Sequence, residues 1–423
     1  MQTNSVIVHD FTSVLSCVHN DDDDDNSSHF TTTTTTTTPL ITSLTFHLFS
    51  STDHLFNSSS PPQLTTTTTT TMVSSSLPLR RTSPRLHSIA AFFYHLLLGL
   101  VDFFIPERLK WADISGQRVL ITGGGSGIGQ LMALRFLRLG CRVVLWDVNE
   151  AGLAETVAKA EAEGLVVLAD DQQQNLKTTT IDLTNREAIY ERAQELQADP
   201  VFGPVDILVN NAGVVSGTQL LDTPDAKIQL TFDVNALAHF FTIKAFLPSM
   251  VERRSGHIVT IASVAGHLAS AQLADYCASK FANVGLDLAL RVELAQAGLT
   301  GLVHTSIVKP FFIATGMFDG SKSDLVPFLE PGYVADRIVS GVRARTPDII
   351  IPYYLVVLFQ LVQFLPQNSA LAIVDFLGGF EAMSHFTGRQ QKKSAEVNGR
   401  NGKELNNNNN KVETETQDGK KVN

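Results

Sequence analysis

The chain has 423 residues, 43% of them hydrophobic, and a formal net charge of −10. One aspartate run, Asp21–Asp25, supplies half of that charge, so the rest of the chain is only mildly acidic, which argues against nucleic acid as a partner. Three cysteines without paired spacing argue against a disulfide framework or a zinc site and favour a reducing compartment.

The two ends of the chain have the composition of disordered segments. Residues 1–85 combine the acidic run with two threonine tracts and few large apolar residues, so they cannot bury a core and are predicted to be a disordered leader. Met72 follows the second tract and is an alternative start, which would make residues 1–71 an upstream extension. Residues 389–423 are rich in asparagine and charge and are predicted to be a disordered polar tail.

An apolar segment, Ser88–Pro106, separates the leader from the rest of the chain. It is marginal for a membrane span, which needs about 20 apolar residues, and Asp102 interrupts it. We therefore interpret residues 86–110 as a helix or short hairpin lying partly in a membrane interface, and the alternative is a helix packed on the domain. If the segment spanned the membrane, the preceding arginines would keep the leader in the cytosol. Asp102 instead favours a segment that does not span, which leaves the catalytic domain in the cytosol.

The stretch that follows has the pattern of a βαβ unit with glycines in its first turn. Glycines let the backbone approach a pyrophosphate, whose charge the N–H groups of the next helix stabilise. The apolar strand is Val119–Thr122, the turn glycines are Gly123, Gly127 and Gly129, the helix is Leu131–Leu139, and the second strand is Cys141–Trp146.

Asp147 ends the second strand, where a carboxylate can accept hydrogen bonds from both ribose hydroxyls of an adenosine. The same carboxylate would repel a 2′-phosphate. The glycine turn and the four residues after Asp147 contain no Arg or Lys, so the sequence favours NAD over NADP.

Three more apolar runs predict further parallel strands with polar residues at their carboxyl ends. They are Thr178–Thr184, ending near Asp182; Val205–Val214, ending in Asn-Asn-Ala-Gly; and Gly256–Gly266, with Ser263 near its end. Strands that alternate with helical stretches indicate an α/β fold with a doubly wound parallel sheet, the Rossmann fold, in a single catalytic domain over residues 111–345. Residues 346–388 form an apolar extension. Within it, the first residues of Ile349–Pro366 are predicted to form a buried strand and the later ones an apolar helix, and the stretch fits core, a substrate-channel wall or a second membrane contact.

Tyr276 and Lys280 lie four positions apart, which places them on one face of a helix. A positive charge near a phenol favours the phenolate and lowers the phenol's pKa. The pair therefore fits a tuned acid/base, although the same spacing also occurs on solvated helices.

Taken together, these residues resemble the short-chain dehydrogenase/reductase family over residues 115–345. The motifs are Thr122–Gly129, Asn210–Gly213, Asn235, Ser263 and Tyr276-x-x-x-Lys280. The apolar segment, the second strand and Lys309–Phe318 resemble the membrane-associated retinol and 17β-hydroxysteroid dehydrogenase branch. Pro310-Phe311 departs from the family's usual Pro-Gly. The resemblance implies cofactor contacts at Gly123, Ser126, Gly127, Ile128, Gly129, Asp147, Asp182, Asn210, Ala212, Gly213, Tyr276, Lys280, Pro310 and Thr315.

The resemblance also implies a mechanism. Tyr276 is the acid/base, Lys280 lowers its pKa and binds the nicotinamide ribose, and Ser263 hydrogen-bonds the substrate oxygen. Asn235 is the proton-relay residue that holds a water near Lys280. Hydride passes directly between NAD and the substrate carbon, and no metal is expected.

The apolar segments suggest a hydrophobic alcohol or carbonyl substrate: a retinoid, a steroid or a long-chain alcohol. The resemblance further implies a homodimer at the endoplasmic reticulum membrane or a lipid droplet surface. Sugar-nucleotide epimerases share Tyr-x-x-x-Lys, but their glycine spacing and larger carboxyl-terminal domain do not fit. The other alternative is a catalytically silent NAD-binding scaffold on a lipid surface.

Overall fold

The computed structural model describes residues 92–94, 96–100, 104–166, 174–323, 326–356, 362 and 364–388. The chain divides into two units, Met1–Thr71 and Met72–Asn423, and all described residues belong to the second. The predicted leader and tail, residues 1–85 and 389–423, lie outside the described residues.

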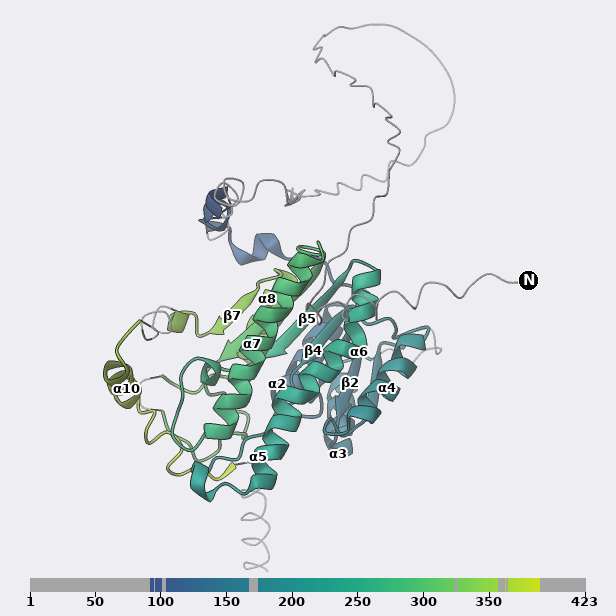
Figure 1. The fold of residues 1–423 in the computed structure, drawn as a ribbon. Helices are drawn as coiled ribbons and strands as arrows, with labels where there is room; N and C mark the ends of the chain where they lie inside the picture. The colour runs from purple at the N-terminus through teal and green to yellow at the C-terminus, as the bar shows by residue number, and fades with distance from the viewer. Residues whose placement is uncertain are drawn as a thin grey trace, which may run out of the picture. The chain divides into compact units, whose positions relative to one another are not determined.

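Seven parallel strands form one sheet in the order β3-β2-β1-β4-β5-β6-β7 (Figure 1). The order reverses direction at β1, as in a doubly wound sheet, so the predicted Rossmann fold is confirmed. The strands are β1 (Arg118–Thr122), β2 (Arg142–Asp147), β3 (Leu176–Thr180), β4 (Ile207–Asn210), β5 (Gly256–Ile261), β6 (Val303–Pro310) and β7 (Asp348–Ile351). The third strand starts and ends earlier than predicted, and β4 is shorter than predicted.

Helices cover both faces of the sheet, because successive strand residues point to opposite faces and both faces are apolar. Val119 and Ile121 pack under α2, α3 and α8, whereas Leu120 packs under α4, α6 and α7. The helices are α2 (Gly127–Arg138), α3 (Glu150–Ala162), α4 (Arg186–Ala198), α5 (Asp225–Phe232), α6 (Ala238–Glu252), α7 (Ala274–Gln296), α8 (Pro331–Arg343) and α10 (Gln367–Phe376). Short turns are η1 (Glu107–Lys110), η2 (Leu220–Asp222), η3 (Asp233–Leu237) and η4 (Val264–Gly266).

Polar residues at the helix starts explain where several helices begin. The side chain of Asn149 accepts a hydrogen bond from Gly152 N, and that of Asn185 accepts one from Ala188 N. Glu330 caps α8 in the same way and is followed by Pro331 at the first helical position.

A π-helical turn, η3, joins α5 and α6 into one continuous run, Asp225–Glu252. Among the described residues this run alone is long and apolar enough to cross a membrane by length and composition. Its buried side chains, Ile243, Phe246 and Met250 among them, pack in the core against the sheet. We therefore assign the run to the interior of the domain.

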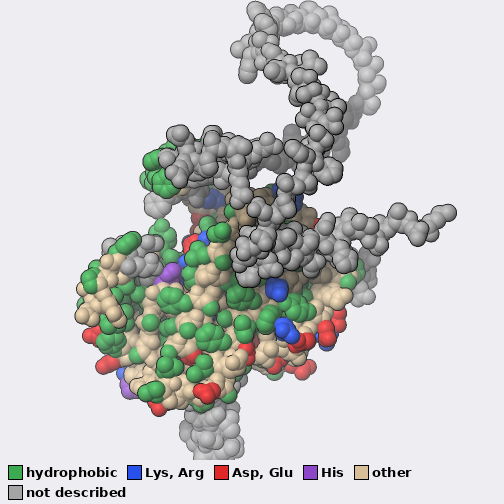
Figure 2. Space-filling model, in the orientation of Figure 1, with side chains coloured by type: hydrophobic (Ala, Val, Ile, Leu, Met, Phe, Trp, Pro, Cys, Tyr) green, Lys and Arg blue, Asp and Glu red, His purple; other side chains and the backbone are tan. Residues whose placement is uncertain are grey.

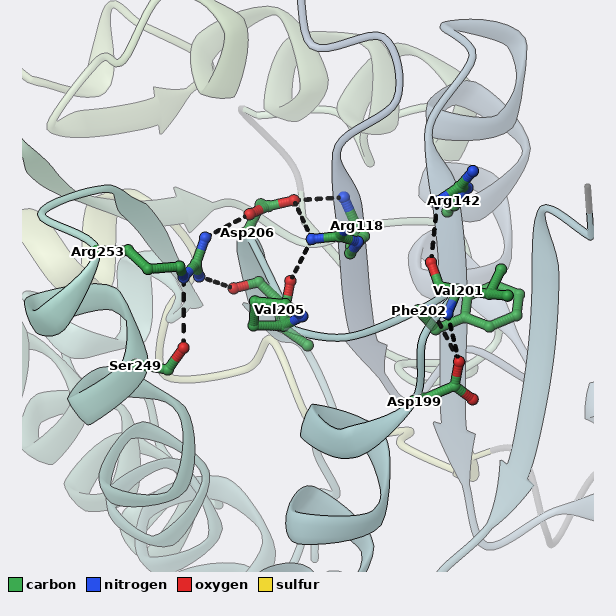
Figure 3. Close-up of polar contacts among 10 residues, drawn as sticks. Arg118, Arg142, Asp199, Val201, Phe202, Val205, Asp206, Ser249 and Arg253 are labelled. Carbon is green, nitrogen blue, oxygen red and sulfur yellow. Dashed lines mark hydrogen bonds and ion pairs between the residues drawn. The ribbon is translucent and has the colours of Figure 1, made fainter. Parts of the chain in front are cut away.

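Polar contacts join the chain at the amino ends of the strands (Figure 3). Asp206, just before β4, accepts a hydrogen bond from Arg253 Nη1 (2.7 Å) and another from the backbone N–H of Arg118 (3.0 Å). Arg253 Nη2 also donates to the Val205 carbonyl (2.7 Å), and Arg142 Nη1 donates to the Val201 carbonyl (3.1 Å). These bonds fix the start of β1, the loop before β4 and the end of α6 relative to one another.

The apolar extension returns to the carboxyl ends of the strands. Its first residues form β7, which agrees with the strand expected there, while most of the predicted apolar helix lies outside the described residues. Residues 377–388, here called the carboxyl-terminal strap, follow α10. The strap is bonded to loops of the domain: Ser270 Oγ donates to Gly379 O and Lys322 N to Ala382 O, both at 2.8 Å.

Candidate active site

A cavity of about 530 Å³ lies at the carboxyl edge of the sheet. Its walls come from the turns after β1, β2, β4, β5 and β6, together with α7 and the strap. In a doubly wound fold, ligands bind at this edge, at the point where the strand order reverses. The position of the cavity therefore follows from the topology of the sheet.

The glycine turn after β1 forms one end of the cavity. Gly123 and Gly127 have φ values of +68° and +58°, which residues with a Cβ rarely adopt. At Gly129 the requirement for glycine comes from close packing: a methyl group there would lie 2.1 Å from the Gly123 carbonyl oxygen. Asn211 Nδ2 donates to the Thr122 carbonyl (2.8 Å) and holds the turn against the loop after β4. This close backbone fits the cradle that a pyrophosphate requires.

Asp147 stands beside the glycine turn at the end of β2. Its Oδ2 accepts a hydrogen bond from Gly125 N (2.8 Å), and its Oδ1 accepts one from Asn149 N (2.9 Å). These bonds fix the carboxylate, and each oxygen retains a lone pair directed elsewhere. Among the described residues that line the cavity, Lys280 and Lys322 alone are basic, and neither neighbours Asp147 in sequence. This end of the cavity therefore fits an adenosine ribose with two free hydroxyls.

Ser263, Tyr276 and Lys280 lie together in the middle of the cavity. Ser263 follows β5 and accepts a hydrogen bond from Ala265 N (3.1 Å), which orients its hydroxyl. Tyr276 and Lys280 lie one turn apart on α7, with Lys280 Nζ 5.6 Å from the centre of the tyrosine ring. Lys280 Nζ also donates to the Ile261 carbonyl (2.8 Å), so its ammonium is held between helix and sheet.

Burial governs the electrostatics of this group. It raises the pKa of the Tyr276 phenol, while a hydrogen bond with Ser263 acts in the opposite direction and lowers it. Burial also lowers the pKa of Lys280 to about 8. In the protein chain by itself, burial is the largest influence on the phenol, and the role of Lys280 in lowering the pKa of Tyr276 stays a prediction.

Asn235 lies in the π-helical turn η3, next to this group. Its Nδ2 donates to the Val214 carbonyl (2.9 Å) and to Ser279 Oγ (3.1 Å), and its Oδ1 accepts from Val214 N (2.8 Å). A methyl group at Gly213 would lie 3.4 Å from Asn235 Oδ1 and 3.8 Å from Lys280 Nζ. Glycine at this position therefore leaves space between the amide and the ammonium.

Most of the predicted site residues line one cavity. These are Gly123, Ser126, Gly127, Ile128, Asp147, Asp182, Ala212, Gly213, Ser263, Tyr276, Lys280, Pro310 and Thr315. Three do not line it: Gly129 packs behind the turn, Asn235 is fully buried beside Lys280, and Asn210 points away to accept a hydrogen bond from Thr242. Asn211, which the sequence analysis did not single out, lines the cavity in place of Asn210.

The other end of the cavity is apolar. Phe312 and Phe318 stack edge to face, with ring centres 4.9 Å apart, and Phe318 also meets the ring of Tyr276 at 5.7 Å. The last helix and the strap close this end with Val374, Leu377 and Ala382. By its sequence Ile349–Pro366 fits core, a substrate-channel wall or a membrane contact; in the structure Ile349 and Ile351 lie in the core and Leu355 lines the cavity. In the structure, α10 and the strap are part of the cavity wall.

Known proteins match this chain over most of its folded part. The family model for short chain dehydrogenase matches residues 117–325. Rat 17-beta-hydroxysteroid dehydrogenase 13 is 41% identical over 285 residues, which cover 67% of this chain and 90% of that protein. The chain belongs to the short-chain dehydrogenase/reductase family. Human epidermal retinol dehydrogenase 2 is 39% identical over 71% of this chain and 94% of its own length.

A solved structure agrees with this assignment. A short-chain dehydrogenase/reductase from Burkholderia phymatum in complex with NAD has a TM-score of 0.52 at 27% identity, covering 60% of this chain and 94% of that one. The family uses NAD or NADP to interconvert alcohols and carbonyl compounds, so the chain is an oxidoreductase acting on CH–OH groups. The resemblance to the retinol and 17β-hydroxysteroid dehydrogenase branch is likewise confirmed by the named relatives.

Proposed function

We propose that the protein interconverts a hydrophobic alcohol and its aldehyde or ketone with NAD as cofactor. One observation carries this proposal: Ser263, Tyr276 and Lys280 line the same cavity as the glycine turn, and the Tyr276 ring contacts Phe318 of the apolar end. A substrate carbon held beside Tyr276 would therefore contact both the cofactor end and a hydrophobic chamber.

The glycine turn and Asp147 would hold NAD, which would supply hydride transfer to and from the substrate carbon. Tyr276 Oη takes the hydroxyl proton in oxidation and gives it back in reduction. Ser263 Oγ hydrogen-bonds the same substrate oxygen and stabilises the charge that develops there. Lys280 holds positive charge beside the phenol and favours its ionised form. Asn235 lies beside Lys280 and holds the relay water.

NAD rather than NADP fits the adenosine end of the site. Both Asp147 oxygens are fixed by backbone N–H groups, so the carboxylate stays in place to bind the ribose hydroxyls. A 2′-phosphate would meet that negative charge, and the two basic residues of the described cavity wall, Lys280 and Lys322, come from α7 and the loop after β6 and not from the turns after β1 and β2.

The substrate is hydrophobic because the chamber beyond Tyr276 is lined by aromatic and aliphatic side chains, including Phe312, Phe318 and Leu377. Relatives named as 17-beta-hydroxysteroid and retinol dehydrogenases support a steroid or a retinoid, and the chamber also suits a long-chain alcohol. A polar or short alcohol would leave much of the apolar wall uncovered.

Two apolar surfaces support a homodimer and a lipid surface as partners. Phe240, Phe281, Leu288 and Val292 are exposed on α6 and α7, and a second copy would cover them. Figure 2 shows hydrophobic side chains over the face on which α6 and α7 lie in Figure 1. Phe92, Phe93 and Leu97 in the apolar segment are 61% exposed each, as a helix in a membrane interface requires. We place the protein at the endoplasmic reticulum membrane or a lipid droplet, with a cytosolic catalytic domain.

The proposal is tested by following NADH at 340 nm with the full-length protein in detergent. The panel is retinol, a 17β-hydroxysteroid and a long-chain alcohol, with ethanol as the polar control and NADP as the cofactor control. We expect at least one apolar alcohol to reduce NAD with a kcat/KM at least 100-fold above that of ethanol. NAD binding without turnover of any alcohol or of the matching carbonyls would contradict the proposal and favour the scaffold.

A further inference from the structure

Two layers of polar contacts lie between α7, the α5–α6 run and the loop after β4. In the first, Ser216 Oγ and Thr231 Oγ1 donate to the two oxygens of Asp275 at 2.7 and 2.8 Å. In the second, Asn235 bonds both the Val214 carbonyl and Ser279 Oγ. From the first layer to the second, the contributing residue moves back two positions in the loop and forward four positions in each helix: Ser216 to Val214, Thr231 to Asn235 and Asp275 to Ser279. The same spacing therefore relates the two layers. We call this arrangement the polar ladder.

The same step predicts a third layer made of Ala212, His239 and Asn283. Residues four apart on a helix lie one above the other, so His239 follows Asn235 and Asn283 follows Ser279 on the facing sides of α6 and α7. A hydrogen bond with the Ala212 carbonyl raises the pKa of His239, so this carbonyl lies beside the imidazole ring. The third layer thus continues the register of the first two.

The third layer differs from the others in its hydrogen bonds. His239 and Asn283 are fully buried, at 1% and 0% exposure. Nδ1 and Nε2 of His239 and Nδ2 and Oδ1 of Asn283 all lack a hydrogen-bond partner of normal geometry among the described residues. Buried polar groups in proteins are paired with other groups or with ordered water, and a buried water commonly makes about three such bonds. Because the Ala212 carbonyl lies beside the His239 ring, the other ring nitrogen and the Asn283 amide are the buried polar atoms of this layer for which a water is the expected partner.

This layer lies next to the proposed proton-transfer group. Burial lowers the pKa of His239, and the positive charge of Lys280 lowers it further, to about 3. The imidazole is therefore neutral, with one nitrogen as donor and the other as acceptor. Such a ring can accept a proton at one nitrogen and release one from the other without a lasting charge.

We propose that His239 and Asn283 hold a buried water that exchanges protons with Lys280, so that His239 is a further positioning residue of the reaction. The inference rests on the proposed function. In each oxidation the substrate carbon loses a hydride to the cofactor, and the hydroxyl proton goes to Tyr276 and must then reach solvent. The water of the third layer takes that proton onward from Lys280 and returns it in reduction.

The same face of α7 gives the path an end at the surface. Asp287 lies one turn beyond Asn283, buried, with Oδ2 2.5 Å from Arg291 Nη2. Arg291 Nη1 in turn donates to Asp348 at 2.8 Å, and the Asp348 side chain is 43% exposed. Polar side chains thus extend inward from Tyr276 along successive turns of α7 and emerge at the opposite end of the sheet.

The experiment compares His239→Phe and Asn283→Leu with wild type in the full-length protein, using the alcohol found in the panel. Each variant removes the polar atoms and keeps a similar volume. We expect kcat to fall at least tenfold and its solvent deuterium isotope effect to rise, while the KM for NAD changes less than twofold. Since the two residues share one water, the double variant is expected to be no slower than the slower single variant.

His257→Phe is the matched control. His257 is also a buried neutral histidine, but its Nε2 pairs with Ser306 Oγ at 2.8 Å, near the amino end of β5 and away from Lys280. We expect this variant to keep kcat within twofold of wild type. Thermal unfolding of all variants separates loss of folding from loss of turnover, and Asn283→Leu carries the test if His239→Phe does not fold.

Wild-type kcat and isotope effect in both single variants would overturn the inference, and so would an equal fall in His257→Phe. A wild-type protein that binds NAD but turns over no substrate would overturn the proposed function itself. The two failures are therefore distinguishable.

Discussion

The two ends of the parallel sheet are built for different purposes. At the amino ends, Asp206 is neutralised by Arg253 and bonded to the start of β1, so its charge is balanced and its oxygens are paired (Figure 3). At the carboxyl ends, Lys280 keeps a buried ammonium without a carboxylate partner in the described chain, and two glycines take left-handed backbone conformations. The amino ends of the strands therefore carry paired charges that favour stability, whereas the carboxyl ends hold the Lys280 ammonium in surroundings that disfavour its charge.

This difference has a physical reason. Shifted pKa values, positive φ angles and close backbone approach are useful at a reacting centre, although each costs folding free energy. A sheet with all its strands parallel places every strand end of one kind at one edge, so the cost can be confined there. The following predictions test this separation of roles.

Apart from removal of the Tyr276 phenol, the largest effect is expected from Ser263→Ala at the carboxyl edge. Removing the hydroxyl that stabilises developing charge on the substrate oxygen should lower kcat by about 10²- to 10³-fold. NAD affinity, measured by calorimetry, should change less than threefold, because the turn glycines and Asp147 are untouched. A kcat within tenfold of wild type would contradict the role of Ser263.

Cofactor choice should respond next. Asp147→Ser removes the carboxylate that binds the ribose and repels a 2′-phosphate. Hydrogen bonds to charged groups contribute about 1.5–3 kcal/mol, so the ratio of kcat/KM for NAD over NADP should fall by about 10- to 100-fold. An unchanged ratio would show that selection between the cofactors lies elsewhere in the site.

Stability should rise when the buried charge is removed. Lys280→Met eliminates an ammonium whose pKa burial lowers from 10.5 to about 8. Below pH 8 both folded and unfolded wild type carry this charge, so burial lowers stability there. Between pH 8 and 10.5 the unfolded chain binds more protons than the folded one, and wild-type stability rises with pH.

The variant should therefore unfold about 2–4 °C above wild type at pH 7, with the gain shrinking as pH rises toward 10.5. Activity should be lost at the same time. The expected gain in stability is smaller than the pKa shift of Lys280 alone would give, because the Ile261 carbonyl loses its hydrogen-bond donor. Calorimetry at several pH values measures it, and a pH-independent difference between the proteins would contradict the argument.

The smallest effect is expected at the amino edge. Asp206→Asn removes a charge whose partners are partly exposed, so it should destabilise the fold by about 1 kcal/mol. Urea denaturation should show the loss, while kcat and the KM for NAD stay within twofold of wild type. A tenfold fall in kcat with folding intact would break the separation between the two edges.

Much of the fold and the cofactor end of the site could be predicted from the sequence, because both depend on local signals. Apolar runs mark buried strands, and Gly123 and Gly127 mark backbone that only glycine adopts easily. Tyr276 and Lys280 depend on helical spacing alone. These features need little knowledge of distant parts of the chain.

Other features depend on tertiary contacts that no local pattern encodes. The strap reaches the cavity through a bond between Ser270 and Gly379, 109 residues apart. Adjacent asparagines differ in role because β4 ends at Asn210, which turns that side chain inward and leaves Asn211 at the cavity. The surroundings of Tyr276 are a similar case: the spacing shows the ammonium of Lys280 but not the burial that raises the pKa of the phenol.

The most direct test of the central claim is turnover by Tyr276→Phe. The variant removes only the phenol oxygen, and NAD binding by calorimetry serves as its control. We expect NAD affinity within threefold of wild type and a kcat at least 10³-fold lower, because the phenol is the group that exchanges the substrate proton in the proposed mechanism. A variant that binds NAD normally and retains more than a tenth of wild-type kcat would contradict the account.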